Sequence, residues 1–206
     1  MIYEVRLQLN PQSRDARRVM ADHYQMHQRL RYISPEENQD LSERQGRVLW
    51  RYIDQGVIVR STVPLDWQKF DQRYPDFGSR HHITLKPNFQ VGERFFFNCL
   101  AYARGTNING KDVPKRAETY LDWLHNHAKA SGFGVDEARV VRQEQYPIKM
   151  SGGSIKLLPV ELLGLLCVKN NMAFQFVFEN GLGRMRGYGC GLVLLKRLDE
   201  DIENFD

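Results

Sequence analysis

Short apolar segments with the spacing of β-strands alternate with segments of helical periodicity along the first half of the chain. The strand patterns lie at residues 2–9, 48–53, 57–63 and 81–86. A helical region can begin at Ser13 or Asp15, which are both good N-terminal caps, and it extends to about Ile33. A shorter helix can follow Asp66 and end near Tyr74. The first half therefore predicts the order β-α-β-β-α-β.

The second half repeats this order with one additional short strand. Its strand and helix patterns lie at residues 94–103, 115–131, 135–147, 154–158, 160–168, 170–180 and 188–195. Strands and helices would alternate strictly in a parallel α/β sheet, so the pattern favours an α+β fold. We expect two ferredoxin-like (RRM-like) βαββαβ domains in tandem, residues 1–88 and 89–206, with an extra basic β-hairpin in the second.

Positive charge is unevenly distributed along the chain. The net charge is +4, but residues 198–206 contain five acids and no base, so residues 1–197 alone carry +9. Twenty of the 29 bases are arginine, whose guanidinium suits bidentate phosphate contacts and stacking on bases. Residues 139–197 contain nine bases and three acids. We therefore expect the C-terminal third, before the acidic tail 198–206, to bind an anion; a solvated charged face is the alternative.

The cysteines and the apolar segments predict a cytoplasmic protein. Cys99, Cys167 and Cys190 are an odd number of cysteines, and the first residues contain no charged and apolar leader. The longest apolar stretch, residues 157–168, is too short to span a bilayer and is broken by a proline and a glutamate. We expect no disulfide and no membrane segment, with the cysteines serving as small core residues.

Residues 181–191 form a basic segment with five glycines between a helical pattern and a strand pattern. A dinucleotide-binding fingerprint has the opposite order, with the glycines between a strand and a helix. Glycines leave main-chain N–H groups uncovered for a phosphate, and the arginines and the tyrosine of the segment add charge and a stacking surface. A polynucleotide backbone is thus the favoured ligand, and a plain turn is the alternative. The predicted contacts are Gly181, Gly183, Arg184, Arg186 and Tyr188.

Within the first helical region, residues 22–31 carry a chemically useful polar face. Tyr24, His27 and Arg31 follow one another at i, i+3 and i+7, beside the apolar face formed by Met26, Leu30 and Ile33. An imidazole, a phenol and a guanidinium are the groups that metal-independent RNA cleavage needs. The ribose 2′-OH must lose a proton, the leaving 5′-oxygen must gain one, and the phosphorane needs a cation.

Tyr24, His27 and Arg31 are therefore the predicted catalytic residues, and an ordinary surface histidine is the alternative. His23 and His27 have a spacing that can chelate zinc, but the segment has no glutamate in the HExxH position and no obvious third ligand. We expect no metal and no cofactor.

Five short motifs occur in order along nearly the whole chain. They are Val5-Arg6-Leu7-Gln8-Leu9-Asn10, Tyr24-Gln25-Met26-His27, Gly110-Lys111-Asp112-Val113-Pro114, Trp123-Leu124 followed by Gly132-Phe133, and the glycine segment ending in Gly189-Cys190-Gly191-Leu192. Each motif is short, but their order and spacing together are specific. In these motifs the chain resembles the CasE-type CRISPR-associated endoribonucleases, the repeat-processing subunits of type I-E Cascade.

The resemblance implies a double ferredoxin-like enzyme that binds the stem-loop of CRISPR repeat RNA and cuts at its 3′ base. The family's reaction is metal-independent attack by the 2′-OH, which leaves a 5′-hydroxyl and a 2′,3′-cyclic phosphate. The resemblance places His27 at the catalytic histidine and Tyr24 at its neighbouring tyrosine. Lys149 and Lys156 flank residues 151–154, which resemble the basic hairpin that holds the RNA stem. The implied protein is a monomer when free and then stays on its product with the other Cascade subunits.

Two points stay open at the level of the sequence. Gln28 stands where the family often has an arginine, and Arg29 and Arg31 are offset from it, so Arg31 is chosen as the cation by helical spacing alone. A non-catalytic RNA-hairpin-binding subunit would use the same hairpin and glycine segment while the face with Tyr24 and His27 only packs. A protein-interaction subunit would instead bind RNA without hairpin preference and in a salt-sensitive way.

Overall fold

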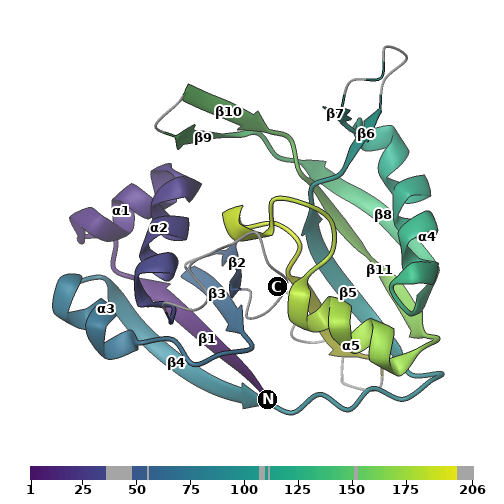
Figure 1. Cartoon of the computed structure of the whole chain (residues 1–206), viewed down its shortest axis with the longest axis horizontal. Coiled ribbons are helices and arrows are strands. Elements are labelled where there is room, and N and C mark those ends of the chain that lie inside the picture. Colours follow the sequence, from purple (N-terminus) through teal and green to yellow (C-terminus); the bar gives the residue numbers. More distant parts are fainter. Residues whose placement is uncertain (36–47, 55, 107–109, 111, 151–152, 199–206) are drawn as a thin grey trace.

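Two four-stranded antiparallel sheets, one in each half of the chain, form the framework of the computed structural model (Figure 1). The structure describes residues 1–35, 48–54, 56–106, 110, 112–150 and 153–198. Three features singled out in the sequence lie partly or wholly outside these described residues. They are Lys111 in the Gly-Lys motif, residues 151–152 of the predicted hairpin and residues 199–206 of the acidic tail.

The first half has the predicted order of strands and helices. Its elements are β1 (Ile2–Leu9), α1 (Arg14–Ala21), α2 (His23–Ile33), β2 (Val48–Ile53), β3 (Gly56–Ser61), α3 (Trp67–Arg73) and β4 (Gly78–Leu85). The strands lie in the order β2-β3-β1-β4. This is the ferredoxin-like arrangement, in which the first and third strands are central. The helices cover one face of the sheet, where apolar residues of β1 pack on Met26, Leu30 and Ile33 of α2 as predicted.

One helical region predicted from the sequence is divided into two helices. Ser13 begins α1, because its hydroxyl oxygen accepts the N–H of Ala16 at 3.3 Å. Asp22 then has an extended backbone, with φ −151° and ψ 111°, and its carboxylate accepts the N–H of Tyr24 at 3.0 Å. Asp22 therefore ends α1 and caps α2, a break that helical periodicity alone does not indicate.

The second half repeats the fold with two additional hairpins. Its elements are β5 (Arg94–Ala101), β6 (Arg104–Thr106), β7 (Asp112–Pro114), η2 (Ala117–Thr119), α4 (Tyr120–Ala130), β8 (Phe133–Gln143), β9 (Tyr146–Met150), β10 (Gly153–Leu157), β11 (Val160–Val168), α5 (Asn171–Asn180), η3 (Arg186–Tyr188) and β12 (Val193–Arg197). The sheet order β12-β5-β11-β8 matches that of the first half, while β6–β7 and β9–β10 pair separately. The predicted α+β fold with tandem ferredoxin-like units and an extra hairpin is confirmed; the boundary at residues 88 and 89 stays a prediction.

The last predicted strand, residues 188–195, begins later than expected. The short 3-10 turn η3 precedes it, and Gly189 and Gly191 have φ values of +87° and +83°. Two such left-handed residues interrupt the regular extended backbone of a strand, and β12 starts only at Val193. As a result, residues 181–192 form a loop that extends from the second half toward α2 (Figure 1).

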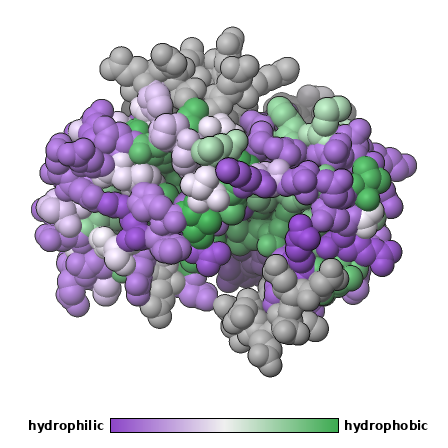
Figure 2. Space-filling view, turned by 90° about the horizontal axis from the view of Figure 1, so that it is seen from below, coloured by the Kyte–Doolittle hydropathy of each residue, from purple (hydrophilic) through white to green (hydrophobic). Residues whose placement is uncertain are grey.

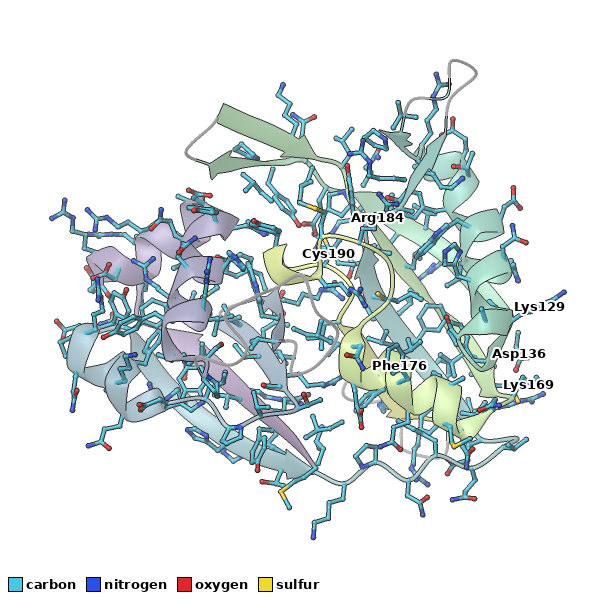
Figure 3. The ribbon with its side chains drawn as sticks, viewed as in Figure 1. Lys129, Asp136, Lys169, Phe176, Arg184 and Cys190 are labelled. Carbon is cyan, nitrogen blue, oxygen red and sulfur yellow. The ribbon has the colours of Figure 1, made fainter. Side chains whose placement is uncertain are left out.

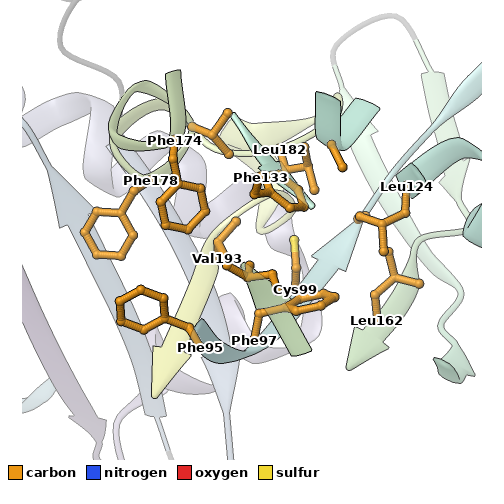
Figure 4. Packing of buried hydrophobic residues seen from close by; sticks show 14 of the residues in the cluster. Phe95, Phe97, Cys99, Leu124, Phe133, Leu162, Phe174, Phe178, Leu182 and Val193 are labelled. Atoms are coloured by element: carbon orange, nitrogen blue, oxygen red, sulfur yellow. The ribbon is translucent and has the colours of Figure 1, made fainter. Parts of the chain in front are cut away.

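Aromatic residues dominate the core of the second half (Figure 4). Phe89 meets Phe174 and Phe178 of α5 edge to face, with ring centroids 4.7 and 5.2 Å apart.

All three cysteines are buried, as the sequence predicted. Among the described helices, none combines the length and the apolar character that crossing a membrane would require.

Arg60 of β3 joins the two halves through buried polar contacts. Its side chain is 3% exposed and donates hydrogen bonds to the carboxylate of Glu4 at 2.8 and 3.0 Å. It also donates to the carbonyl oxygen of Val193 at 2.9 Å and lies 3.9 Å from the ring centroid of Phe178. Glu4 belongs to the first half, whereas Val193 and Phe178 belong to the second. Arg60 and Glu4 therefore hold one face of the first sheet, the face that its helices leave uncovered, against β12 and α5.

Arg51 of β2 makes a second buried connection. It donates hydrogen bonds to Asn98 of β5 and Glu161 of β11. Glu161 also accepts from Asn98 at 2.9 Å and forms an ion pair with Arg142 at 2.8 Å. An unpaired buried charge is costly, so these partners make one relative placement of the two sheets strongly preferred.

Replacing Arg60 by alanine should lower the free energy of unfolding by about 3–5 kcal/mol, because the buried carboxylate of Glu4 loses both of its short hydrogen bonds. Urea unfolding followed by tryptophan fluorescence measures the loss. Arg94→Ala is the control, since Arg94 pairs with Asp136 at 3.2 Å but its side chain is 55% exposed. The control should change stability by less than about 1 kcal/mol. Equal losses in the two variants would show that the contacts of Arg60 do not hold the halves together.

Candidate functional site

The predicted catalytic residues of α2 lie against the η3 turn from the other half of the chain. The ring centroid of His27 is 4.7 Å from that of Tyr188 and 6.2 Å from that of Tyr24. Arg31 is exposed beside them, and its positive charge acts on both His27 and Tyr188. The structure thus gathers an imidazole, two phenols and a guanidinium at one place.

The environment of His27 favours the neutral imidazole. The residue is 8% exposed, and this burial is the main cause that lowers its pKa below 6.5. The charge of Arg31 lowers the pKa further, while a hydrogen bond with the backbone of Gly187 opposes both effects. Nδ1 is the ring nitrogen of His27 nearest to Gly187, because a Cβ on Gly187 would be only 3.2 Å from it.

The η3 turn has a left-handed residue at each end. Met185, which precedes it, has φ +56° and is the one non-glycine residue with positive φ among those that the structure describes. Gly189, which follows it, has φ +87°. The indole Nε1 of Trp50 donates a hydrogen bond to the carbonyl oxygen of Gly187 at 2.8 Å. A residue of β2 in the first half thereby holds the turn beside α2.

His23 is the main residue of the site that sequence reasoning missed. Its Nδ1 lies 3.2 Å from the carbonyl oxygen of Tyr188, and its ring stacks on Tyr146 with centroids 3.6 Å apart. Trp50 and Tyr52 complete an aromatic enclosure around the imidazole. Among the described residues, no cluster of three or more His, Cys, Asp or Glu side chains could hold a metal ion. The i, i+4 spacing of His23 and His27 could have indicated that His23 belongs to the same site, since residues one turn apart share a helix face.

The two arginines near His27 have different environments. Arg29 is buried, donates a hydrogen bond to Asp15 at 2.7 Å, and lies over the ring of Tyr74. These contacts direct it away from the face of His27 and into the packing of α1 and α3. Arg31 is instead exposed, which agrees with its choice as the cation of the site.

The glycine segment is shaped largely by contacts within the protein. Gly181 is buried and donates its N–H to the carbonyl of Val177 at 2.7 Å, so this amide closes α5. A Cβ on Gly183 would lie 2.9 Å from the carbonyl oxygen of Tyr102. Both glycines have positive φ and allow the loop to pack closely. Their predicted contacts with RNA stay predictions.

The arginines of this segment also differ from each other. Arg186 is half-buried and donates from Nη1 to the carbonyl oxygens of Asn180 at 2.9 Å and Gly181 at 3.3 Å, which fastens the loop to the end of α5. Arg184 is labelled on the glycine segment in Figure 3. It is exposed, and its backbone N–H donates to the carbonyl of Tyr102. Arg184 is therefore the better placed of the two to meet a ligand.

The predicted basic hairpin is present as β9 and β10, which extend past the N-terminal helices (Figure 1). Lys149 lies opposite Ser154, and Lys156 lies opposite Pro147. Lys156 is exposed, whereas only the backbone of Lys149 is described. Tyr146, the first residue of β9, connects the base of the hairpin to His23.

A cleft of about 780 Å³ lies between the two sheets. His23 and Gly189 form part of its wall, and the cations Arg6, Arg142 and Lys196 alternate there with acidic residues. Apolar residues gather in the middle of the molecule between hydrophilic flanks when it is seen from below (Figure 2). Because the charges of the cleft are mixed, it is a weaker candidate for anion binding than the surface around His27 and Arg184.

The fold and the site define the class as a double ferredoxin-like protein with a composite site between its halves. Residues 2–197 match the protein family described as CRISPR associated protein. The chain belongs to this family, which confirms the resemblance found in the motifs.

Known relatives agree with this assignment. The CRISPR-associated endoribonuclease Cse3 of Thermus thermophilus is 32% identical over 138 residues, which span 62% of this chain and 62% of the relative. A Thermus thermophilus Cse3 structure, bound to an RNA representing a pre-cleavage complex, has a TM-score of 0.81 at 23% identity and covers 95% of this chain and 98% of its own. A chain of a CRISPR RNA-guided surveillance complex in its pre-nicking state has a TM-score of 0.71 at 20% identity, with coverage of 95% and 100%.

Gly189→Ala should destabilise the protein more than Gly92→Ala does. Both residues have positive φ, +87° and +93°, so each alanine carries a backbone strain of about 1 kcal/mol. The new methyl group at residue 189 would lie 3.2 Å from His23 and from Trp50, whereas nothing lies within 4 Å of the one at residue 92. Overpacking should add about 1–3 kcal/mol at residue 189 alone. Urea unfolding compares the two variants, and equal losses would mean that the turn does not pack tightly on α2 and β2.

Proposed function

We propose that this protein is a metal-independent endoribonuclease that binds the stem-loop of CRISPR repeat RNA and cleaves it at the 3′ base of the stem. The observation that carries the proposal is the neutral, half-enclosed imidazole of His27 beside Tyr24, Tyr188 and Arg31. These groups can take up a proton, supply a proton and stabilise negative charge without help from a metal ion. The identity to an endoribonuclease of the same family supports the same reaction.

His27 acts as the general base in this proposal. Its lowered pKa favours the neutral imidazole at pH 7, and the proton acceptor is taken to be Nε2, the ring nitrogen farther from Gly187. Nε2 removes the proton of the ribose 2′-OH, and the 2′-oxygen attacks the adjacent phosphorus. The bond from phosphorus to the 5′-oxygen then breaks. The products are a 2′,3′-cyclic phosphate and a 5′-hydroxyl.

Tyr24 and Arg31 complete the proposed reaction. The hydroxyl of Tyr24 gives its proton to the leaving 5′-oxygen. After product formation Tyr24 regains a proton from solvent and His27 releases to solvent the one it took from the 2′-OH. The guanidinium of Arg31 faces the additional negative charge of the phosphorane. Tyr188 limits the space beside His27 and offers a ring face to the base next to the cut.

The RNA stem is proposed to lie across basic residues of the second half. Lys149 and Lys156 of the β9–β10 hairpin and Arg184 of the glycine segment contact phosphates, while Arg186, Gly181 and Gly183 give that segment its shape. The similarity to a chain of a surveillance complex supports assembly with the other Cascade subunits on the retained product. Before assembly the protein is proposed to be a cytoplasmic monomer.

His27→Ala should slow cleavage strongly and leave RNA binding intact. The test incubates the protein with its repeat hairpin in excess EDTA, alongside the same RNA with a single 2′-deoxy at the cut. The unmodified protein should cleave only the all-ribose RNA, and the variant should be slower by about 10²–10⁴-fold with an unchanged Kd. His125→Ala is the control, since His125 is exposed on α4. Tight binding without cleavage by the unmodified protein would instead identify a non-catalytic RNA-binding subunit.

The cleavage rate should depend on pH in the direction of a neutral base. Because the pKa of His27 lies below 6.5, the imidazole is neutral above that value and becomes protonated as the pH falls through its pKa. The single-turnover rate should therefore be constant between about pH 7 and 8 and should decrease at lower pH. A rate that rises on acidification would assign His27 the role of general acid.

A further inference from the structure

The carbonyl oxygen of Tyr188 lies between two polar groups from different elements. His23 Nδ1 of α2 is 3.2 Å away, and the Tyr146 hydroxyl of β9 donates a hydrogen bond to it at 3.2 Å. A carbonyl oxygen has two lone pairs and no proton, so it can accept both bonds only if His23 carries its proton on Nδ1. The tautomer of His23 is thus determined by this contact.

The ring of His23 is enclosed by aromatic side chains. It stacks on Tyr146 with an interplanar angle of 15° and meets Tyr52 edge to face at 4.9 Å. Burial is the main cause that lowers the pKa of His23, and the bond to Tyr188 opposes it. A neutral imidazole donates one hydrogen bond here without placing a positive charge in the aromatic enclosure.

The contact at Tyr188 bears directly on His27. The ring of Tyr188 lies 4.7 Å from that of His27, and the preceding residue, Gly187, lies against His27, since a Cβ on it would be 3.2 Å from Nδ1. Gly187 and Tyr188 are successive residues of one three-residue turn. The carbonyl group that His23 contacts therefore belongs to the same turn that packs on His27.

We propose that His23 is a positioning residue for cleavage, which fixes the η3 turn against His27 by donating from Nδ1 to the Tyr188 carbonyl. This inference rests on the proposed endoribonuclease function. Tyr146 is the second donor to the same oxygen and belongs to the hairpin that is proposed to hold RNA. The clamp formed by His23 and Tyr146 thus connects the RNA-holding hairpin to the group that removes the proton.

Two replacements of His23 test the effect of its hydrogen bond and the effect of its aromatic ring separately. His23→Phe keeps an aromatic ring for Tyr146 and removes the donor, whereas His23→Asn keeps an N–H close to the position of Nδ1 and removes the ring. Small displacements of a catalytic group slow reactions steeply, so His23→Phe should lower the single-turnover rate by about 10–100-fold. His23→Asn should recover most of that rate. Neither variant should change the Kd of the RNA hairpin.

The pH profile distinguishes positioning from direct proton transfer. The decrease in rate at low pH belongs to His27 and should persist in His23→Phe, at a lower absolute rate. If His23 transferred protons itself, this variant would lose an inflection of the profile and His23→Asn would not recover activity. Either result would overturn the inference.

Tyr146→Phe tests the other half of the clamp with almost no change in shape. It removes the second donor to the Tyr188 carbonyl, and with His23→Phe it forms a double-mutant cycle. The two losses should be non-additive because both donors hold one oxygen. His125→Phe controls for replacing an exposed histidine, and urea unfolding verifies that each variant is folded at the assay temperature.

If the unmodified protein cleaves and His23→Phe cleaves equally fast, the inference fails while the proposed function stands. If the unmodified protein does not cleave, the proposed function itself is refuted.

Discussion

Arg60 and Arg51 reach from the first sheet into the second half of the molecule, and the rest of the structure depends on these buried guanidinium groups. Each has left water almost completely, which is tolerated only because carboxylate and carbonyl oxygens take the place of solvent. A displaced sheet would leave a charge buried without a partner. The two ferredoxin-like units are therefore fixed in a single relative orientation by electrostatics, and apolar packing around Leu49, Ile58 and Leu192 fills the space between them.

That fixed orientation is what creates the candidate site. Helix α2 supplies Tyr24, His27 and Arg31, but the backbone that orients His27 belongs to the η3 turn at the far end of the sequence. His23 and Trp50 bind two successive carbonyl groups of this turn at 3.2 and 2.8 Å. The imidazole is thus placed by contacts from both units, and its lowered pKa arises from the burial that their contact produces.

The elements were largely predictable from the sequence because their signals are local. The alternation in residues 2–9 and the cap at Ser13 predicted β1 and the start of α1, and helical spacing alone put Tyr24 and His27 on one face. The break at Asp22 was missed, since an N-terminal cap within a periodic segment does not interrupt its hydrophobic pattern. The late start of β12 was missed because apolar residues near the glycines suggested a strand, whereas their positive φ values exclude one.

The partners of His23 were not predictable in this way. Tyr188 lies 165 residues from His23 in the sequence, and Trp50 lies 137 residues from Gly187. Contacts over such distances follow from how the two sheets dock, and no local pattern encodes that. The resemblance in the motifs predicted that the glycine segment matters, but its glycines prove to shape the loop through close packing rather than by leaving every amide uncovered.

Because residues from both halves form the site, the order in which the two halves fold during synthesis matters. During synthesis the first unit can fold while the chain is still being extended, yet His27 then lacks Gly187 and Tyr188 beside it. The imidazole would be open to water and loosely held until the second sheet has formed and docked. The arrangement of side chains at this site should therefore arise late and all at once, when the second sheet docks on the first.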